Sequence, residues 1–127
     1  MKRDIKLIVT DIDGTIAKAD NSISDNVKNC FNKLKQHGIK VVVATGRMLP
    51  AAKLMAQRLN LDTPLIVYQG AVVQNANDEK PLYANYVEKD CVVEIIKYLR
   101  QRKVQRHFTS DISFSSTGTP FFFIYST

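Results

Sequence analysis

Three apolar runs in the first half of the chain predict buried β-strands. They are short, rich in β-branched residues and continuously apolar rather than alternating. Continuous runs are typical of parallel sheets whose strands are covered by helices, whereas half-exposed strands alternate apolar and polar positions. Polar or glycine-containing residues follow each run. The predicted strands cover residues 5–10, 39–44 and 64–68.

Between these strands, apolar residues recur at helical spacing. Ser24 can cap a first helix, and Gly38 stands where that helix would end. Pro50 suits the first turn of a second helix. Alternating strands and helices predict an α/β fold, namely a Rossmann-like parallel sheet with flanking helices. The apolar stripes comprise Val27, Cys30, Phe31 and Leu34 in the first helix and Ala51, Ala52, Met55 and Leu59 in the second.

From Ala71 onward the pattern changes. Residues 71–74 and 82–87 predict a β-hairpin, and residues 88–102 predict an amphipathic helix. Two further strands are expected near 104–109 and 120–125, around a Ser/Thr-rich turn at 115–119. A helix followed by antiparallel strands indicates an α+β module. We therefore expect one domain over residues 1–81 and the beginning of another over 82–127. The apolar positions of the helix are Val92, Ile95, Ile96 and Leu99.

Composition narrows the class of protein. The chain has 127 residues, 45% of them hydrophobic and 24% charged, which is ordinary for a globular protein and excludes disordered, collagen-like and disulfide-framework classes. No apolar run approaches the ~20 residues that span a bilayer. The two cysteines, Cys30 and Cys91, lie within apolar patterns and are predicted to be small buried residues in a reducing compartment. We expect a cytoplasmic protein.

The chain has a net charge of +6, and one basic stretch, residues 97–106, contains no acidic residue. Such a stretch can form a solvated helix end or can contact phosphate or nucleic acid. The first interpretation is favoured because no RNA-binding or zinc-finger motif accompanies it. We therefore expect no nucleic-acid or membrane partner. The basic residues of this stretch are Lys97, Arg100, Arg102, Lys103 and Arg106.

The strongest chemical signal is a pair of carboxylates, Asp11 and Asp13, directly after the first strand. Two close carboxylates repel each other unless a cation lies between them, and Mg²⁺ binds one or two carboxylates together with phosphate oxygens. One carboxylate can attack phosphorus, while the other transfers protons to the leaving oxygen and from water. The pattern D-x-D-G-T arises by chance about once per thousand chains of this size.

The loops after the other strands contribute phosphate donors. Ligands in parallel sheets bind beyond the carboxyl ends of the strands, so these loops should converge there. Thr45 offers a hydroxyl and Gly46 an unhindered amide, while Gly14 lets the backbone turn closely. Arg47 can reach a phosphate or cap a helix, and the sequence leaves both roles open. The expected phosphate or substrate contacts are therefore Ile12, Gly14, Thr45, Gly46, Arg47, Gln69 and Gly70.

The motifs at residues 7–15 and 41–47 resemble those of the haloacid dehalogenase-like (HAD) superfamily, specifically the Cof-type phosphatases. The resemblance implies that Asp11 is the nucleophile and a magnesium ligand. It implies that Asp13 is the general acid/base and lends its backbone carbonyl to magnesium, and that Thr45 binds phosphate. Residues 66–71 resemble the next family signature, except that Gln69 stands where Asn is usual.

The resemblance also implies that residues 1–81 form part of the HAD core and that the segment from Leu82 begins the cap. Family members are about twice as long and carry a further Lys and acidic pair beyond the cap. We therefore expect an N-terminal portion that is weakly active or inactive. A sheet ending after its third strand would leave open edges that favour homodimers.

Two functions compete on the sequence alone. The first is a magnesium-dependent phosphatase acting on small phosphorylated metabolites through an aspartyl-phosphate, with phosphotransfer as a variant. The second is a non-catalytic binding or assembly module that retains the phosphate-site loops and uses the basic stretch 97–106. Replacing Asp11 by Asn distinguishes them, because only the enzyme would lose its function.

Overall fold

The computed structural model describes residues 4–102, 107–109 and 123–125. The chain divides into two compact units, Met1–Ala84 and Asn85–Thr127. β5 (Tyr83–Ala84) pairs with β4 (Val72–Gln74) and so belongs to the first unit, whereas the division of core and cap expected at 81/82 stays a prediction. Each unit is described by itself.

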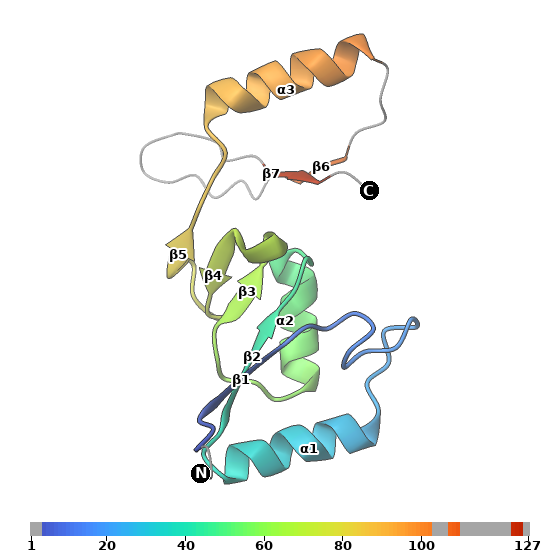
Figure 1. The fold of residues 1–127 in the computed structure, drawn as a ribbon, viewed down its shortest axis with the longest axis vertical. Coiled ribbons are helices and arrows are strands. Elements are labelled where there is room, and N and C mark those ends of the chain that lie inside the picture. The colour runs from blue at the N-terminus through green and yellow to red at the C-terminus, as the bar shows by residue number, and fades with distance from the viewer. Residues whose placement is uncertain (1–3, 103–106, 110–122, 126–127) are drawn as a thin grey trace. The chain divides into compact units, whose positions relative to one another are not determined.

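The first unit contains a five-stranded mixed sheet with the order β1-β2-β3-β4-β5 (Figure 1). β1 (Leu7–Thr10), β2 (Lys40–Ala44) and β3 (Leu65–Val67) are parallel, as their continuous apolar runs predict. The expected hairpin is present, but it joins this sheet: β4 pairs antiparallel with β3, and β5 pairs antiparallel with β4. The predicted α/β class is therefore confirmed, and the sheet is mixed because the hairpin adds two antiparallel strands to the three parallel ones.

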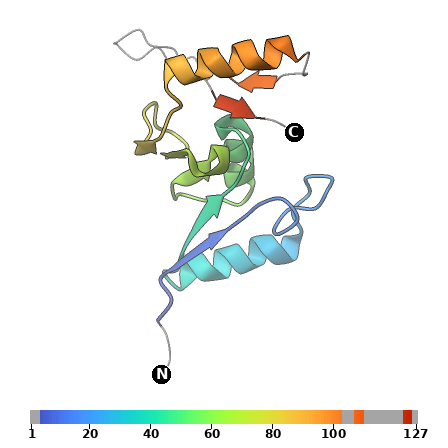
Figure 2. The same ribbon diagram turned by 45° about the horizontal axis from the view of Figure 1, so that its top comes forward.

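The helices of this unit begin at their predicted signals. The Ser24 hydroxyl accepts from the Val27 amide (3.4 Å) at the start of α1 (Asp25–Gln36). Gly38 follows this helix with φ +71°, a left-handed conformation that suits glycine. Pro50 lies in the first turn of α2 (Leu49–Arg58). Both helices follow right-handed crossovers in one direction along the sheet, so both lie on the same face (Figure 1, Figure 2).

The covered face carries the core of this unit. Val41 of β2 packs with Phe31 of α1 and with Leu59. The alternate residues of β1, Leu7 and Val9, point to the opposite face and are each 53% exposed. The flanking helices expected from the sequence are present: in the part of the chain that the structure describes, α1 and α2 cover one face of this sheet.

The second unit contains α3 (Lys89–Gln101) and the antiparallel pair β6 (His107–Thr109) and β7 (Phe123–Tyr125). These elements lie within the helix and strands expected there, while the turn at 115–119 lies outside the described residues. Val92 is buried, as predicted. Ile95 is exposed, contrary to its assignment to the inner stripe.

Both cysteines are exposed, so the prediction that they are buried is wrong. Cys30 lies at the margin of the α1 stripe, where Phe31 and not its neighbour faces the sheet. Cys91 lies one residue before the buried Val92 and therefore projects in a different direction from the helix. None of the helices in the described ranges combines the length and apolar character required to cross a membrane.

Candidate active site

The predicted site residues gather at one edge of the sheet, where the parallel strands end. Asp11 follows β1 directly, Thr45 follows β2, and Gln69 lies in the 3₁₀ turn Tyr68–Gly70 after β3. The Thr45 amide donates to the Ile66 carbonyl (2.9 Å), which continues the β2–β3 ladder as far as the site. The expected convergence of these loops is therefore present at the level of the backbone.

The loop after β1 holds its two carboxylates on either side of a buried side chain. Ile12 is fully buried, whereas Asp11 and Asp13 are exposed. The Ile12 carbonyl accepts from the amides of Thr15, Ile16 and Ala17 (3.3, 3.1 and 2.9 Å), which closes a tight turn. Gly14 has φ +73° in this turn, the left-handed conformation that glycine adopts readily.

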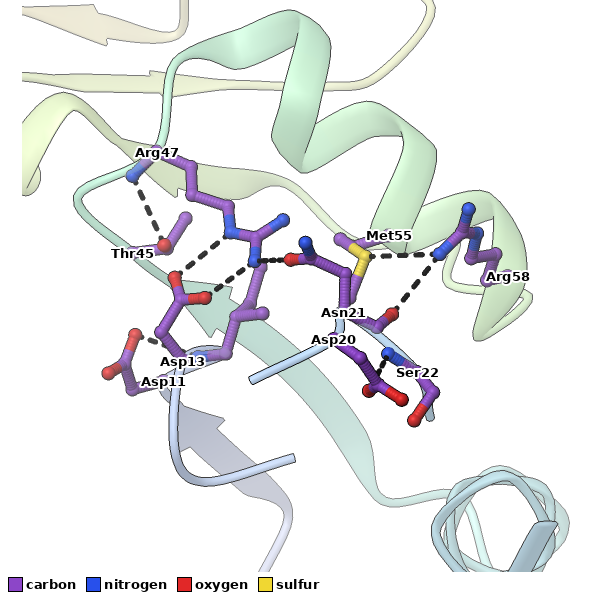
Figure 3. A network of polar contacts seen from close by, with 10 residues as sticks. Asp11, Asp13, Asp20, Asn21, Ser22, Thr45, Arg47, Met55 and Arg58 are labelled. Atoms are coloured by element: carbon purple, nitrogen blue, oxygen red, sulfur yellow. Dashed lines mark hydrogen bonds and ion pairs between the residues drawn. The ribbon is translucent and has the colours of Figure 1, made fainter. Parts of the chain in front are cut away.

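Asp13 forms a bidentate ion pair with Arg47, a residue from the loop after β2 (Figure 3). Arg47 Nε donates to Asp13 Oδ2 (2.9 Å), and Nη2 donates to Oδ1 (2.5 Å). Hydrogen bonding to this guanidinium lowers the pKa of the Asp13 carboxyl and raises that of Arg47. Asp13 is thus a carboxylate at neutral pH, and the loops after β1 and β2 are joined.

Asp11 lies beside this pair and interacts with it through charge. Its carboxylate oxygen Oδ1 accepts from the Ile12 amide (2.7 Å). After the hydrogen bond and attraction of Asp13, the Asp11 charge is a further cause of the raised Arg47 pKa. The Ile12 amide, predicted to bind phosphate, therefore already has an acceptor, and so does the Gly14 amide, which donates to the Ala17 carbonyl (3.2 Å).

Thr45 is buried at the end of β2, and its hydroxyl oxygen accepts from the Arg47 amide (3.2 Å). That contact uses a lone pair, so the hydroxyl proton can still be donated to another acceptor. Because the side chain is buried, its direction is fixed by packing. Thr45 can therefore act as a preorganised neutral donor beside the two carboxylates.

Gly46 and Gln69 are in direct steric contact across the β2 and β3 loops. A Cβ at position 46 would lie 2.2 Å from Gln69 Nε2, so only glycine fits while the amide remains there. Gln69 has φ +57° and Tyr68 has φ +52°, and the Tyr68 amide donates to the Arg47 carbonyl (3.1 Å). Gln69 and Gly70 are exposed and lie at the same edge of the sheet as Thr45.

Two residues of this region were not predicted. Arg47 Nη2 donates to Asn21 Oδ1, and Arg58 Nη1 donates to the Asn21 carbonyl (3.2 Å) (Figure 3). The polar residues around Asn21 indicate only a loop, and Arg58 is typical of the last turn of a helix. Neither sequence signal points to the carboxylates. Only the fold brings these side chains together.

A model of the haloacid dehalogenase-like hydrolase family matches residues 8–119. The chain belongs to this family. It is similar to two Bacillus subtilis phosphatases of 5-amino-6-(5-phospho-D-ribitylamino)uracil, YitU and YcsE. YitU is 36% identical in a match that covers 58% of this chain and 27% of YitU. YcsE is 32% identical in a match that covers 67% of this chain and 36% of YcsE. The chain therefore spans about a third of the length of these relatives.

The fold is also that of solved members of the family. A haloacid dehalogenase-like hydrolase from B. subtilis superposes with a TM-score of 0.70, over 84% of this chain and 36% of that structure, at 24% sequence identity. At this identity the superposition supports the fold and not a substrate. The resemblance inferred from the two motifs at residues 7–15 and 41–47 is thus confirmed at the level of the family.

The described residues of this HAD-like chain contain no cluster of three or more His, Cys, Asp or Glu side chains that could hold a metal. Asp11 and Asp13 supply the carboxylate oxygens that the described loops bring to the ends of the parallel strands. A hard cation such as Mg²⁺ binds proteins through one or two carboxylates and completes its coordination with phosphate oxygens and water. The donor set therefore fits a magnesium ion that is held jointly by protein and substrate.

Proposed function

We propose that this HAD-like chain carries the nucleophile end of a magnesium-dependent phosphatase of the Cof type, acting on small phosphorylated metabolites. The observation that carries the proposal is the pair of exposed carboxylates on either side of buried Ile12, at the same sheet edge as the Thr45 hydroxyl. The names of the two relatives support a phosphate monoester of a small metabolite as substrate. Residues 1–84 would belong to the core and 85–127 to the beginning of the cap.

In the proposed reaction, Asp11 is the nucleophile. Its Oδ2 attacks the phosphorus atom, the bond from phosphorus to the substrate oxygen breaks, and an aspartyl-phosphate forms. Oδ1 is already held by the Ile12 amide, which leaves Oδ2 as the oxygen for attack. Water then attacks the phosphorus of the intermediate, releasing inorganic phosphate and regenerating the Asp11 carboxylate.

Asp13 would move the protons of both half-reactions. The Arg47 ion pair keeps Asp13 ionised in the free chain, so Asp13 would first take up a proton from solvent. It would give that proton to the leaving oxygen in the first step and take one from water in the second, so its protonation state is restored. Its carboxylate oxygens both accept from Arg47 in this structure, and each retains a further lone pair. This arrangement favours its backbone carbonyl, rather than its side chain, as the second contact to a metal.

Magnesium, when bound by Asp11 and Asp13, would neutralise charge on the phosphoryl oxygens. The chain's own donors would hold the other oxygens of the phosphoryl group. Thr45 offers its hydroxyl proton and Gly46 its amide, while Gln69 and Gly70 lie beside them. Arg47 would add a positive charge next to the attacking carboxylate.

The proposal is tested with beryllofluoride, which binds an aspartate as an analogue of the phosphoryl group, and with p-nitrophenyl phosphate turnover. We expect a magnesium-dependent ¹⁹F signal from bound beryllofluoride that Asp11→Asn abolishes. Asp90→Asn, which changes an exposed aspartate of α3, is the matched control and should retain it. An unaltered signal in Asp11→Asn would contradict the role of Asp11 and favour a non-catalytic binding module.

A further inference from the structure

A continuous series of hydrogen bonds leads from Asp13 to the last turn of α2. Arg47 donates to Asp13 through Nε and Nη2, and the same Nη2 donates to Asn21 Oδ1 (Figure 3). Arg58, at the end of α2, donates to the Asn21 carbonyl (3.2 Å). Asn21 therefore joins the loop that carries the carboxylates to a helix distant in sequence.

The Arg47 side chain is only 20% exposed, although its Asp13 partner is 56% exposed. A long arginine side chain loses rotamer freedom when it is held in one orientation, so a single surface ion pair stabilises that orientation weakly. The contact to Asn21 supplies a second acceptor, which lies further along the same loop. Two acceptors at different angles define the plane of a guanidinium, because its donors form a rigid fork.

Asn21 is itself held in place by its backbone. It has φ +61°, a left-handed conformation that Asn tolerates better than most residues. Its amide donates to the Lys18 carbonyl (2.9 Å), and the Lys18 amide donates to the Ser22 carbonyl (3.0 Å). The side-chain oxygen of Asn21 is thus directed at Arg47 by a local turn and by Arg58.

We infer that Asn21 is a positioning residue, which fixes the Arg47 guanidinium on Asp13 and so holds the carboxylate at the position from which it transfers protons. The kinetic part of this inference rests on the proposed function, whereas the structural part does not. In the proposed reaction Asn21 does not contact the reacting atoms, and it acts through Arg47 alone.

The left-handed backbone of Asn21 allows the side chain to be removed without strain. Asn21→Gly deletes the acceptor and retains φ near +61°, and Asn21→Asp keeps an acceptor oxygen in the same place. Asn60 provides the matched control because it is also exposed with a positive φ, +51°, and lies just after the end of α2, with no hydrogen bond to Arg47 among the described residues. Asn60→Gly therefore makes the same chemical change away from Arg47.

The first measurement is the hydrogen exchange of the Arg47 Nε–H, assigned in ¹⁵N spectra by its loss in Arg47→Gln. We expect Asn21→Gly to accelerate this exchange about five-fold, the factor for one ordinary hydrogen bond. Asn21→Asp and Asn60→Gly should leave it within about two-fold of the wild-type chain. Unchanged exchange in Asn21→Gly would overturn the inference whether or not the chain is a phosphatase.

The second measurement is the turnover of p-nitrophenyl phosphate. Asn21→Gly should lower kcat about three- to ten-fold with a smaller change in KM, and Asn21→Asp should restore it. The double variant Asn21→Gly/Arg47→Gln should be no slower than Arg47→Gln, because both changes remove one contact. Additive losses, or a faster Asn21→Gly enzyme, would contradict positioning through Arg47. Loss of turnover in every chain, with altered exchange, would instead argue against the proposed function alone.

Discussion

Gln69 Nε2 lies 2.2 Å from the point at which a Cβ on residue 46 would be placed. The two residues come from loops after neighbouring strands, and the contact shows how closely those loops approach. The atoms concerned are at the end of a flexible side chain, so they can move if the space is filled. The contact therefore determines where Gln69 lies more than whether the chain folds.

Gly46→Ala tests this relationship. We expect the methyl group to displace the Gln69 amide while the free energy of unfolding falls by less than about 1 kcal/mol. Urea denaturation measures the second effect, and the Gln69 side-chain amide signals in ¹⁵N spectra measure the first. Gln69→Gly is the companion variant, since glycine suits φ +57°. A large loss of stability in Gly46→Ala that Gln69→Gly does not reverse would show that backbone, and not Gln69, fills this space.

Leu65 tests the core beneath the site. It is fully buried in β3, so Leu65→Ala should lower the free energy of unfolding by about 2–5 kcal/mol. Leu54→Ala is the control, because Leu54 is 59% exposed on α2 and its truncation should change stability by less than about 0.5 kcal/mol. Chemical denaturation of the two variants provides the comparison. Equal losses would contradict the packing of helices on one face of the sheet.

The Asp62–Lys35 ion pair gives a pH-dependent prediction. Lys35 Nζ lies 3.0 Å from Asp62 Oδ2, and this hydrogen bond lowers the pKa of the Asp62 carboxyl. A lowered folded-state pKa stabilises the fold above the ordinary value of 3.8 and loses this contribution as pH falls through the folded pKa. The wild-type chain should therefore exceed Asp62→Asn in stability at neutral pH.

This difference should shrink as the pH falls below the ordinary value of 3.8 and disappear only below the lowered folded-state pKa. Urea denaturation at about pH 7 and about pH 3 measures it, and Lys35→Gln should remove it at both. A difference between the wild-type chain and Asp62→Asn that grows as pH falls would contradict the sign of the pKa shift.

The edge of β1 predicts self-association. β1 pairs with β2 on one side, and its exposed Leu7 and Val9 adjoin the open edge among the described residues. We expect concentration-dependent homodimers, detectable by light scattering coupled to size-exclusion chromatography. Val9→Lys should shift the chain to monomer, because a charge on an edge strand opposes pairing. Lys53→Glu, which alters charge on α2, should not. A monomer at every concentration would contradict the prediction.

Much of the first unit follows from local sequence signals. The continuous apolar runs predict β1, β2 and β3. The capping residue Ser24 predicts the start of α1, and Pro50 predicts the start of α2. The addition of β4 and β5 to the same sheet could not be predicted, because a hairpin pattern does not specify which strand it will join. The exposure of Cys30 was missed because a helical stripe has margins that spacing alone does not resolve.

The site divides in the same way. Asp11, Asp13 and Thr45 follow strands, so their common location could be predicted from topology. The pairing of Asp13 with Arg47 and the contact to Asn21 depend on side-chain rotamers and on a left-handed residue in a loop. Such interactions leave no periodic signal in the sequence. The family model matches residues 8–119, so it supports membership of the family over that range, and it names no substrate.

Ile12 is a core residue that stands between two exposed acids, Asp11 and Asp13, in the sequence. Lifting this turn from the sheet would transfer a whole isoleucine side chain into water, at a cost of about 2–3 kcal/mol before any hydrogen bond is broken. Thermal motion alone would seldom do so. A ligand that arrives here would consequently meet two acids and the Arg47 guanidinium already held in place, and selectivity among ligands would depend on their shape and flexibility.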